Sequence, residues 1–218
     1  MIVKKKIAVV LSGNGVYDGA EIHEAVLTML AIACNGAEYQ IFAPDIQQFH
    51  VINHLTGEEM GEKRNVLVES ARIARGNAQP LSELDMNDYD ALIFPGGFGA
   101  AKNLSSYAYK GDGFTVNTEV ENVIKSAYKA GKPIGALCIA PVILPKVLGE
   151  VMVTIGNDPA TIASIQIMNG KHVETAHGEI VIDKTHRLVT TPCYMLDATI
   201  DQIAKGADNL VKAVLAMV

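Results

Sequence analysis

The sequence predicts an α/β protein, a three-layer sandwich in which helices cover both faces of a mainly parallel sheet. Short apolar runs alternate with helix-length amphipathic segments along the chain, and such alternation is typical of a parallel sheet covered by helices. The apolar run 134–137 ends at Cys138, which small residues flank on both sides. This pattern predicts a nucleophile elbow, a sharp turn from a strand into a helix that presents one reactive side chain.

The composition favours one compact domain over residues 1–218. Apolar residues make up 49% and charged residues 19% of the chain, as in globular proteins. The net charge of −6 gives no general attraction to nucleic acid or to an anionic membrane. The sequence shows no secretory signal and no apolar run of about 20 residues, the length that spans a bilayer. Three widely spaced cysteines argue against disulfides and indicate a reducing cytoplasm.

The first half of the chain predicts three strands and two helices. The continuous apolar run 7–11 indicates a strand that is buried on both faces. Apolar residues at helical spacing, followed by Asn-Gly or Gly-Asn stops, predict the helices. The other elements expected here are a helix over 21–34, a strand over 39–43, a helix over 64–75 and a strand over 90–94.

The second half predicts a helix over 118–130, the strand over 134–137, and a closing helix from 197 to about 217. Four further strands are expected near 151–155, 172–174, 179–183 and 187–191, the last two as a hairpin. The segment 99–117 contains glycine and tyrosine but shows no clear periodicity. We interpret it as a long insertion that lies close to the site.

Three features fall at the carboxyl ends of predicted strands, where α/β sheets bind their ligands. Cys138 is the candidate nucleophile, and the start of the helix behind it is expected to favour its thiolate. Gly96 and Gly97 let the backbone approach a ligand closely. The N–H groups of Gly97 and Ile139 would then form an oxyanion hole.

Carboxylates are the candidate proton carriers. Glu21 and Glu24 open the first helix, where the charge of Glu21 is explained by the helix dipole alone. Glu24 lies one turn later and nearer the apolar stripe, so we expect it to be partly buried, with a raised pKa suited to moving protons. Asp158 follows a strand and is a possible pocket residue.

Other side chains do not extend this site. Ile139 occupies the place directly after the nucleophile, so an adjacent Cys-His dyad is absent. We expect the histidines after residue 49 to be solvated, and Cys34 and Cys193 to have no role. No His, Cys or carboxylate pair shows metal-ligand spacing, so neither a metal nor a cofactor is expected.

Several motifs resemble the DJ-1/PfpI superfamily, which has the class I glutamine amidotransferase-like fold. The similarity is carried by Gly19-Ala20-Glu21-Ile22-His23-Glu24, Pro95-Gly96-Gly97 and Cys138-Ile139-Ala140-Pro141. Longer motifs, among them Val51-Ile52-Asn53-His54-Leu55-Thr56-Gly57, resemble the ElbB-type isoprenoid-biosynthesis glyoxalases within it. The resemblance implies a flavodoxin-like fold, a homodimer, contact between Glu24 and the nucleophilic Cys138, and Gly97 as an N–H donor.

By this resemblance, the leading hypothesis is a glutathione-independent glyoxalase of the glyoxalase III hydro-lyase type. It would convert a small dicarbonyl such as glyoxal to glycolate through a hemithioacetal on Cys138, and a deglycase-type repair of glycated groups would use the same adduct. An alternative is a redox- or carbonyl-sensing protein whose Cys138 is modified with little turnover. An amidotransferase or peptidase is disfavoured because Ile139 stands where relatives carry a histidine.

Overall fold

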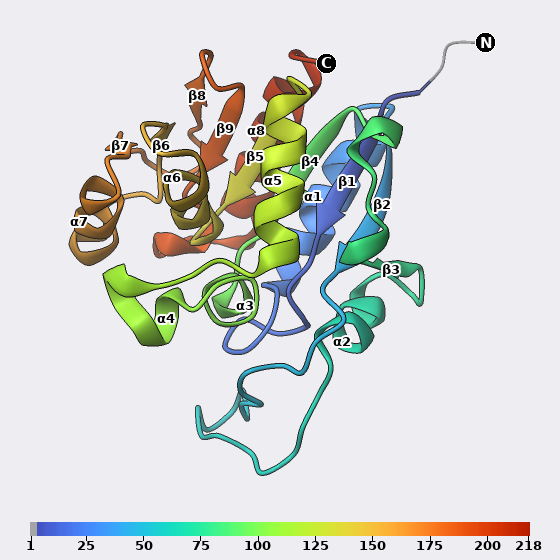
Figure 1. Cartoon of the computed structure of the whole chain (residues 1–218), viewed down its shortest axis with the longest axis vertical. Helices are drawn as coiled ribbons and strands as arrows, with labels where there is room; N and C mark the ends of the chain where they lie inside the picture. The colour runs from blue at the N-terminus through green and yellow to red at the C-terminus, as the bar shows by residue number, and fades with distance from the viewer. Residues whose placement is uncertain (1–3) are drawn as a thin grey trace.

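The computed structural model describes residues 4–218 and contains a seven-stranded sheet in the order β3-β2-β1-β4-β5-β9-β8 (Figure 1). All neighbouring strands run parallel except β8, which pairs antiparallel with β9. The hairpin predicted near the C-terminus is therefore confirmed. The strands are β1 (Lys6–Val10), β2 (Glu38–Ala43), β3 (Ala78–Pro80), β4 (Ala91–Phe94), β5 (Ile134–Leu137), β8 (Val181–Asp183) and β9 (Leu188–Thr191).

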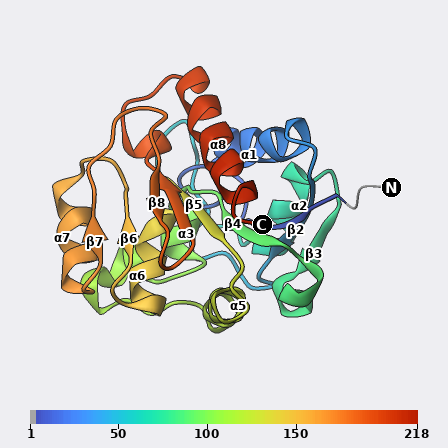
Figure 2. The same ribbon diagram turned by 90° about the horizontal axis from the view of Figure 1, so that it is seen from above.

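Helices cover both faces of this sheet, which confirms the predicted three-layer α/β sandwich. Seen from above, α8 and α1 lie side by side on one face, and α5 lies on the other (Figure 2). The helices are α1 (Ile22–Cys34), α2 (Val66–Ile73), α3 (Phe98–Lys102), α4 (Tyr107–Lys110), α5 (Thr118–Lys129), α6 (Ile143–Leu148), α7 (Pro159–Ile167) and α8 (Ile200–Leu215).

The central strand β1 shows why the apolar runs are continuous. Ile7 and Val9 belong to the buried cluster that β1 shares with α1 and α8. Ala8 and Val10 belong to the cluster on the opposite face, which includes residues of α5. Because successive side chains of a strand point to opposite faces, a strand covered on both sides is apolar at every position.

The topology places a ligand site above the centre of the sheet. From β1 the order runs through β2 and β3 to one edge, whereas β4, β5 and β9 follow on the other side of β1. The direction in which successive strands are added therefore reverses between β1 and β4. In α/β proteins, ligands bind in the crevice at the carboxyl ends of the strands beside such a reversal. The residues after β1, β4, β5 and β9 therefore converge there.

Several elements differ from the predictions. The segment 99–117 is not irregular, since it contains most of α3, all of α4 and a turn of 3-10 helix at 111–113. These pieces are too short to show a helical period. The strands expected near 151–155 and 172–174 shrink to β6 (Met152–Val153) and β7 (Lys171–His172), which form a separate two-stranded sheet.

Helix α7 was not predicted, nor was the short strand β3, whereas the helix expected behind Cys138 is present as α6, after a 3-10 turn at 140–142. The apolar residues of α7 point in several directions: Ile165 is fully buried, whereas Ile167 is largely exposed. Such a helix has no single apolar stripe for a sequence pattern to reveal.

The predicted helices are confirmed, with ends that move inward by at most three residues. Glu21 and Asn65 stand just outside α1 and α2, where their side chains accept backbone N–H groups as N-caps. The sequence pattern does not separate a capping residue from the helix that it caps, although the backbone of the cap is extended. None of the helices within residues 4–218 combines the length and apolar character that crossing a membrane requires.

Candidate active site

Cys138 stands directly after β5, at the turn that the sequence predicted. Its φ of 60° lies in the left-handed region, which is unusual for a residue other than glycine. The backbone N–H of Cys138 donates to the carbonyl oxygen of Thr191 at 2.9 Å, so β9 holds the turn from the side. The side chain is buried, with 6% of its surface exposed.

Gly96 lets the turn after β4 pass close to the nucleophile. A Cβ atom at this position would lie 2.4 Å from the Cβ of Cys138 and 2.6 Å from Oε2 of Glu24. Gly97 has a φ of 95°, and a Cβ atom there would lie 2.3 Å from the backbone nitrogen of Glu21. Any larger residue at either position would push apart the three segments that form the site.

Glu24 lies in the first turn of α1 and has no exposed surface. Its Oε2 accepts the backbone N–H of Gly96 at 2.9 Å, and its Oε1 accepts the N–H of Tyr194 at 3.2 Å. The carboxyl therefore bridges the segments that follow β4 and β9. The sequence predicted partial burial of Glu24, whereas its burial is complete.

Burial sets the protonation of both reactive groups. It raises the pKa of Glu24 to about 8, the nearby charge of Glu21 acting in the same direction. Burial also raises the pKa of the Cys138 thiol well above its usual range, and the Glu24 carboxyl adds to this by charge and by a side-chain hydrogen bond. The N–H groups of Gly97 and Ile139 donate toward the sulfur and act against this rise.

The expectation that the following helix favours the Cys138 thiolate is therefore wrong. A single 3-10 turn at 140–142 separates the cysteine from α6, so the α-helix does not begin at the sulfur. Loss of water around a charged group outweighs two backbone donors. Gly97 and Ile139 line the cavity together with Cys138, and their role as an oxyanion hole stays a prediction.

Glu21 serves the site through the backbone of α1. Its Oε2 accepts the N–H of Glu24 at 2.7 Å, and its own N–H donates to the carbonyl oxygen of Gly96 at 3.0 Å. These two bonds fix the start of α1 against the turn after β4. The structure brings Glu21 to the site as a cap and as a negative charge close to Glu24.

A cavity of about 310 Å³ opens onto Cys138. Gly97, Ile139 and Asp158 line it, together with residues from α3 and α4. The expectation that the 99–117 segment lies near the site is therefore confirmed. Asp158 is the N-cap of α7, and its Oδ2 accepts the N–H of Thr161 at 2.8 Å. Hydrogen bonds from Thr161 lower the pKa of Asp158, so it is ionised.

No histidine lines this cavity in the part of the chain that the structure describes. His23 instead pairs with the hydroxyl of Tyr194, with 2.8 Å between Nδ1 and the hydroxyl oxygen. A larger depression of about 790 Å³ lies between the β8 region and α8. It is open to solvent and no cysteine among residues 4–218 lines it, so the cavity at Cys138 is the candidate active site.

Two neighbours of the nucleophile were missed by sequence reasoning. Tyr194 lines the cavity and donates its N–H to Glu24. Cys193 is buried and close enough for Glu24 and Cys138 to raise its pKa, although the sequence assigned it no role. Both follow β9, the strand next to β5, so the rule that ligands bind at strand ends could have found them.

The pattern of the DJ-1/PfpI family matches residues 15–191. The chain is 47% identical to the human protein called glutamine amidotransferase-like class 1 domain-containing protein 3, mitochondrial, over 97% of this chain and 83% of that protein. It is 45% identical to the mitochondrial ES1 protein homolog of Rattus norvegicus, over 98% of this chain and 84% of that protein.

Solved structures show the same fold. The isoprenoid biosynthesis protein with an amidotransferase-like domain from Ehrlichia chaffeensis is 35% identical, with a TM-score of 0.92 over 98% of this chain and 99% of that one. Glyoxalase III from Candida albicans is 15% identical, with a TM-score of 0.64 over 98% of this chain and 97% of that one. The second likeness concerns the fold alone.

The expectation of a cytoplasmic location is wrong. The human, rat and zebrafish relatives are all named as mitochondrial proteins, which points away from a purely cytoplasmic location. The expectation rested on the cysteines and on the absence of a secretory pattern. Those features indicate a reducing compartment, but they do not distinguish one such compartment from another.

Proposed function

The chain belongs to the DJ-1/PfpI family, and from this membership we propose that it is a glutathione-independent glyoxalase with Cys138 as its nucleophile. One observation carries the proposal. The buried Glu24 carboxyl, with a pKa of about 8, lies with the Cys138 side chain against Gly96, at a cavity that Cys138 lines. An acid with a pKa near the working pH can both take up and return a proton.

The first step adds the thiol to the substrate. Glu24 as carboxylate takes the Cys138 proton while the sulfur attacks one aldehyde carbon of glyoxal. The carbonyl π electrons move to oxygen, and the N–H groups of Gly97 and Ile139 stabilise that oxyanion. The proton on Glu24 then passes to the oxygen, which gives a neutral hemithioacetal and restores the carboxylate.

The second step moves hydrogen between the two carbons. Glu24 removes the proton from the carbon that bears sulfur, which gives an enediolate. The hydroxyl proton on that carbon passes to the neighbouring oxygen, and Glu24 returns its proton to the neighbouring carbon. The product is a glycolyl thioester on Cys138. Water attacks its carbonyl carbon, the carbon–sulfur bond breaks, and glycolate leaves while the thiol regains its proton. The sum is glyoxal plus water giving glycolate and one proton, with no external oxidant.

Turnover of glyoxal without glutathione tests the proposal directly. We expect Cys138→Ser to lose turnover, and Glu24→Gln to lower kcat by about 10²- to 10⁴-fold, because it removes a general acid–base group. Cys34→Ser is the matched control, since Cys34 is exposed at the far end of α1. Full turnover by Cys138→Ser would show that the mechanism is wrong.

The same assay separates this proposal from a sensing role. A sensor predicts negligible turnover by the wild type together with stoichiometric modification of Cys138, which intact-mass measurement after mild peroxide would detect.

A further inference from the structure

The cavity at Cys138 is much larger than the small dicarbonyl that the reaction needs. A water molecule takes up about 30 Å³ of liquid, so a volume of about 310 Å³ has room for about ten. Glyoxal would fill only a small part of this space. Pockets of such volume hold ligands that carry a substituent well beyond the reacting atoms.

The walls of the cavity define what that substituent is. Aromatic and aliphatic side chains form most of the lining, among them Phe98, Tyr107, Tyr194 and Met195. Burial of an apolar group against such walls stabilises a complex in proportion to the apolar area removed from water. The lining therefore suits an apolar group attached to the dicarbonyl.

Asp158 is the one acidic side chain that lines this space among residues 4–218. Asp158 lines the cavity, and no lysine, arginine or histidine among residues 4–218 lines it. The N-terminus of α7 holds the Asp158 carboxylate through the N–H of Thr161. Its charge therefore opposes any second anion in the cavity.

We propose that Cys138, Asp158 and the apolar walls together select an uncharged 2-oxoaldehyde with an apolar substituent larger than methyl, and reject carboxylates. This inference rests on the proposed glyoxalase function. It also explains product release, because the reaction turns a neutral aldehyde into a 2-hydroxy carboxylate beside Asp158. Repulsion between the two carboxylates speeds the departure of the product.

Turnover measurements provide the first test, with phenylglyoxal as the bulky probe. We expect kcat/KM for phenylglyoxal to exceed that for glyoxal by about tenfold or more, because the ring is buried against apolar walls. Equal values, or a preference for glyoxal, would overturn the inference while leaving the glyoxalase function intact. No turnover of any 2-oxoaldehyde would instead overturn the proposed function.

A binding measurement tests the charge selection without turnover. Mandelate and its neutral methyl ester have the same ring and differ by one charge. We expect methyl mandelate to protect Cys138 from alkylation by iodoacetamide. The concentration needed for half-protection should be about tenfold lower for the ester than for mandelate. Asp158→Asn is expected to bring the two protective concentrations together, because asparagine keeps the N-cap of α7 and removes the charge.

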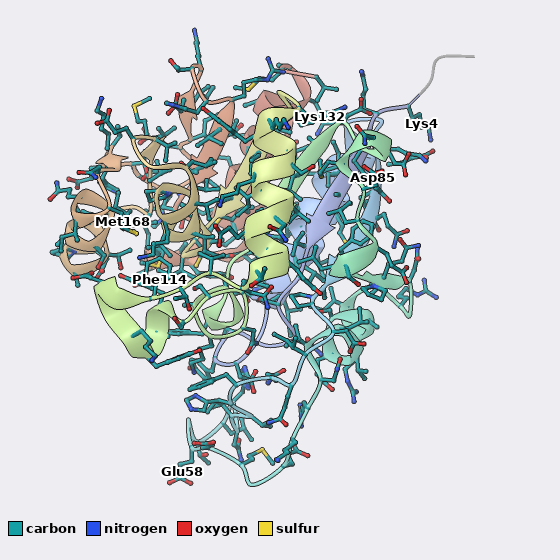
Figure 3. All side chains as sticks on the ribbon, viewed as in Figure 1. Lys4, Glu58, Asp85, Phe114, Lys132 and Met168 are labelled. Atoms are coloured by element: carbon teal, nitrogen blue, oxygen red, sulfur yellow. The ribbon has the colours of Figure 1, made fainter. Side chains whose placement is uncertain are left out.

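Asp85→Asn is the matched control for this experiment. Asp85 also caps a helical turn, through the N–H of Asn87. It lies across the molecule from Met168, the residue that follows α7 (Figure 3). We expect this variant to keep the wild-type ratio between the two protective concentrations. The inference is overturned if Asp158→Asn also keeps that ratio, or if wild type binds mandelate as well as the ester.

Discussion

The Glu24 carboxyl and the Cys138 thiol are so close that the charge of one raises the pKa of the other. Two coupled groups lose their protons in steps that belong to the pair. The first proton leaves at a pH near 8, the pKa of Glu24. After that step, Glu24 is a carboxylate beside a Cys138 thiol that keeps its proton, which is the state that the proposed mechanism uses.

The rate of Cys138 alkylation should therefore depend steeply on pH. We expect slow reaction with iodoacetamide at pH 6 and a rate that still rises between pH 8 and 9, because burial disfavours the thiolate. Stopped samples analysed by intact mass give the rate at each pH. Exposed Cys34 in the Cys138→Ser variant supplies the reference curve. A Cys138 rate that levels off below pH 7 would contradict the raised pKa.

Glu24 also makes the stability of the fold depend on pH. Its pKa is 4.5 when unperturbed and about 8 in the folded protein. Below pH 4.5 both states hold the proton, whereas between pH 4.5 and 8 only the folded state keeps it. Glu24 therefore lowers stability as the pH rises across this window, at up to about 1.4 kcal/mol per pKa unit.

Glu24→Gln should flatten this dependence. We expect the urea midpoint of the variant to fall less than that of wild type between pH 5.5 and 8.5, since glutamine does not titrate. The exposed Glu38, replaced by glutamine, is the control. Parallel curves for wild type and Glu24→Gln would show that burial does not shift the pKa of Glu24.

At the scale of elements, the site depends on how closely the segment after β4 approaches β5 and α1. Gly96 is the point of closest approach, since its N–H reaches Glu24 and its α-carbon faces Cys138. A methyl group there would also meet the carbonyl oxygen of Leu137 at 2.9 Å. The backbone of both strands resists such a displacement.

Gly96→Ala should therefore damage the fold and the site together. We expect a loss of about 1–3 kcal/mol in the free energy of unfolding, the usual cost of overpacking, and a fall in kcat. Urea unfolding and the glyoxal assay measure the two effects. Gly61→Ala is the control, because Gly61 has no positive φ and nothing lies within 4 Å of an added Cβ. If both variants had similar free energies of unfolding, the space around Gly96 would be large enough for a methyl group, and this prediction would be wrong.

Elements with a strong local pattern could be predicted, and short ones could not. The central strands are apolar at every position because both faces are covered, and α1 and α5 carry clear caps and stripes. Helices α3 and α4 span five and four residues, which is too few to display a helical period. These two helices nevertheless supply a large part of the cavity wall.

At the scale of the whole molecule, the strand order brings together residues that lie far apart in the chain. Glu24, Gly96, Cys138 and Asp158 were predicted as site residues because each follows a strand or opens a helix. Tyr194 also follows a strand, but only the position of β9 next to β5 brings it to Cys138. The homodimer and the small dicarbonyl substrate stay predictions, which sedimentation velocity and the turnover assay test.

The sequence by itself determined the layered α/β fold and the elbow at Cys138, because both follow from patterns within a few consecutive residues. Only the tertiary structure decided the chemistry of that elbow. Burial of Glu24 and Cys138 is the sum of contributions from α1, β4, β5 and β9, and it reverses the thiolate preference that the local sequence indicates. The cavity, likewise, forms only when α3, α4 and α7 close around the nucleophile.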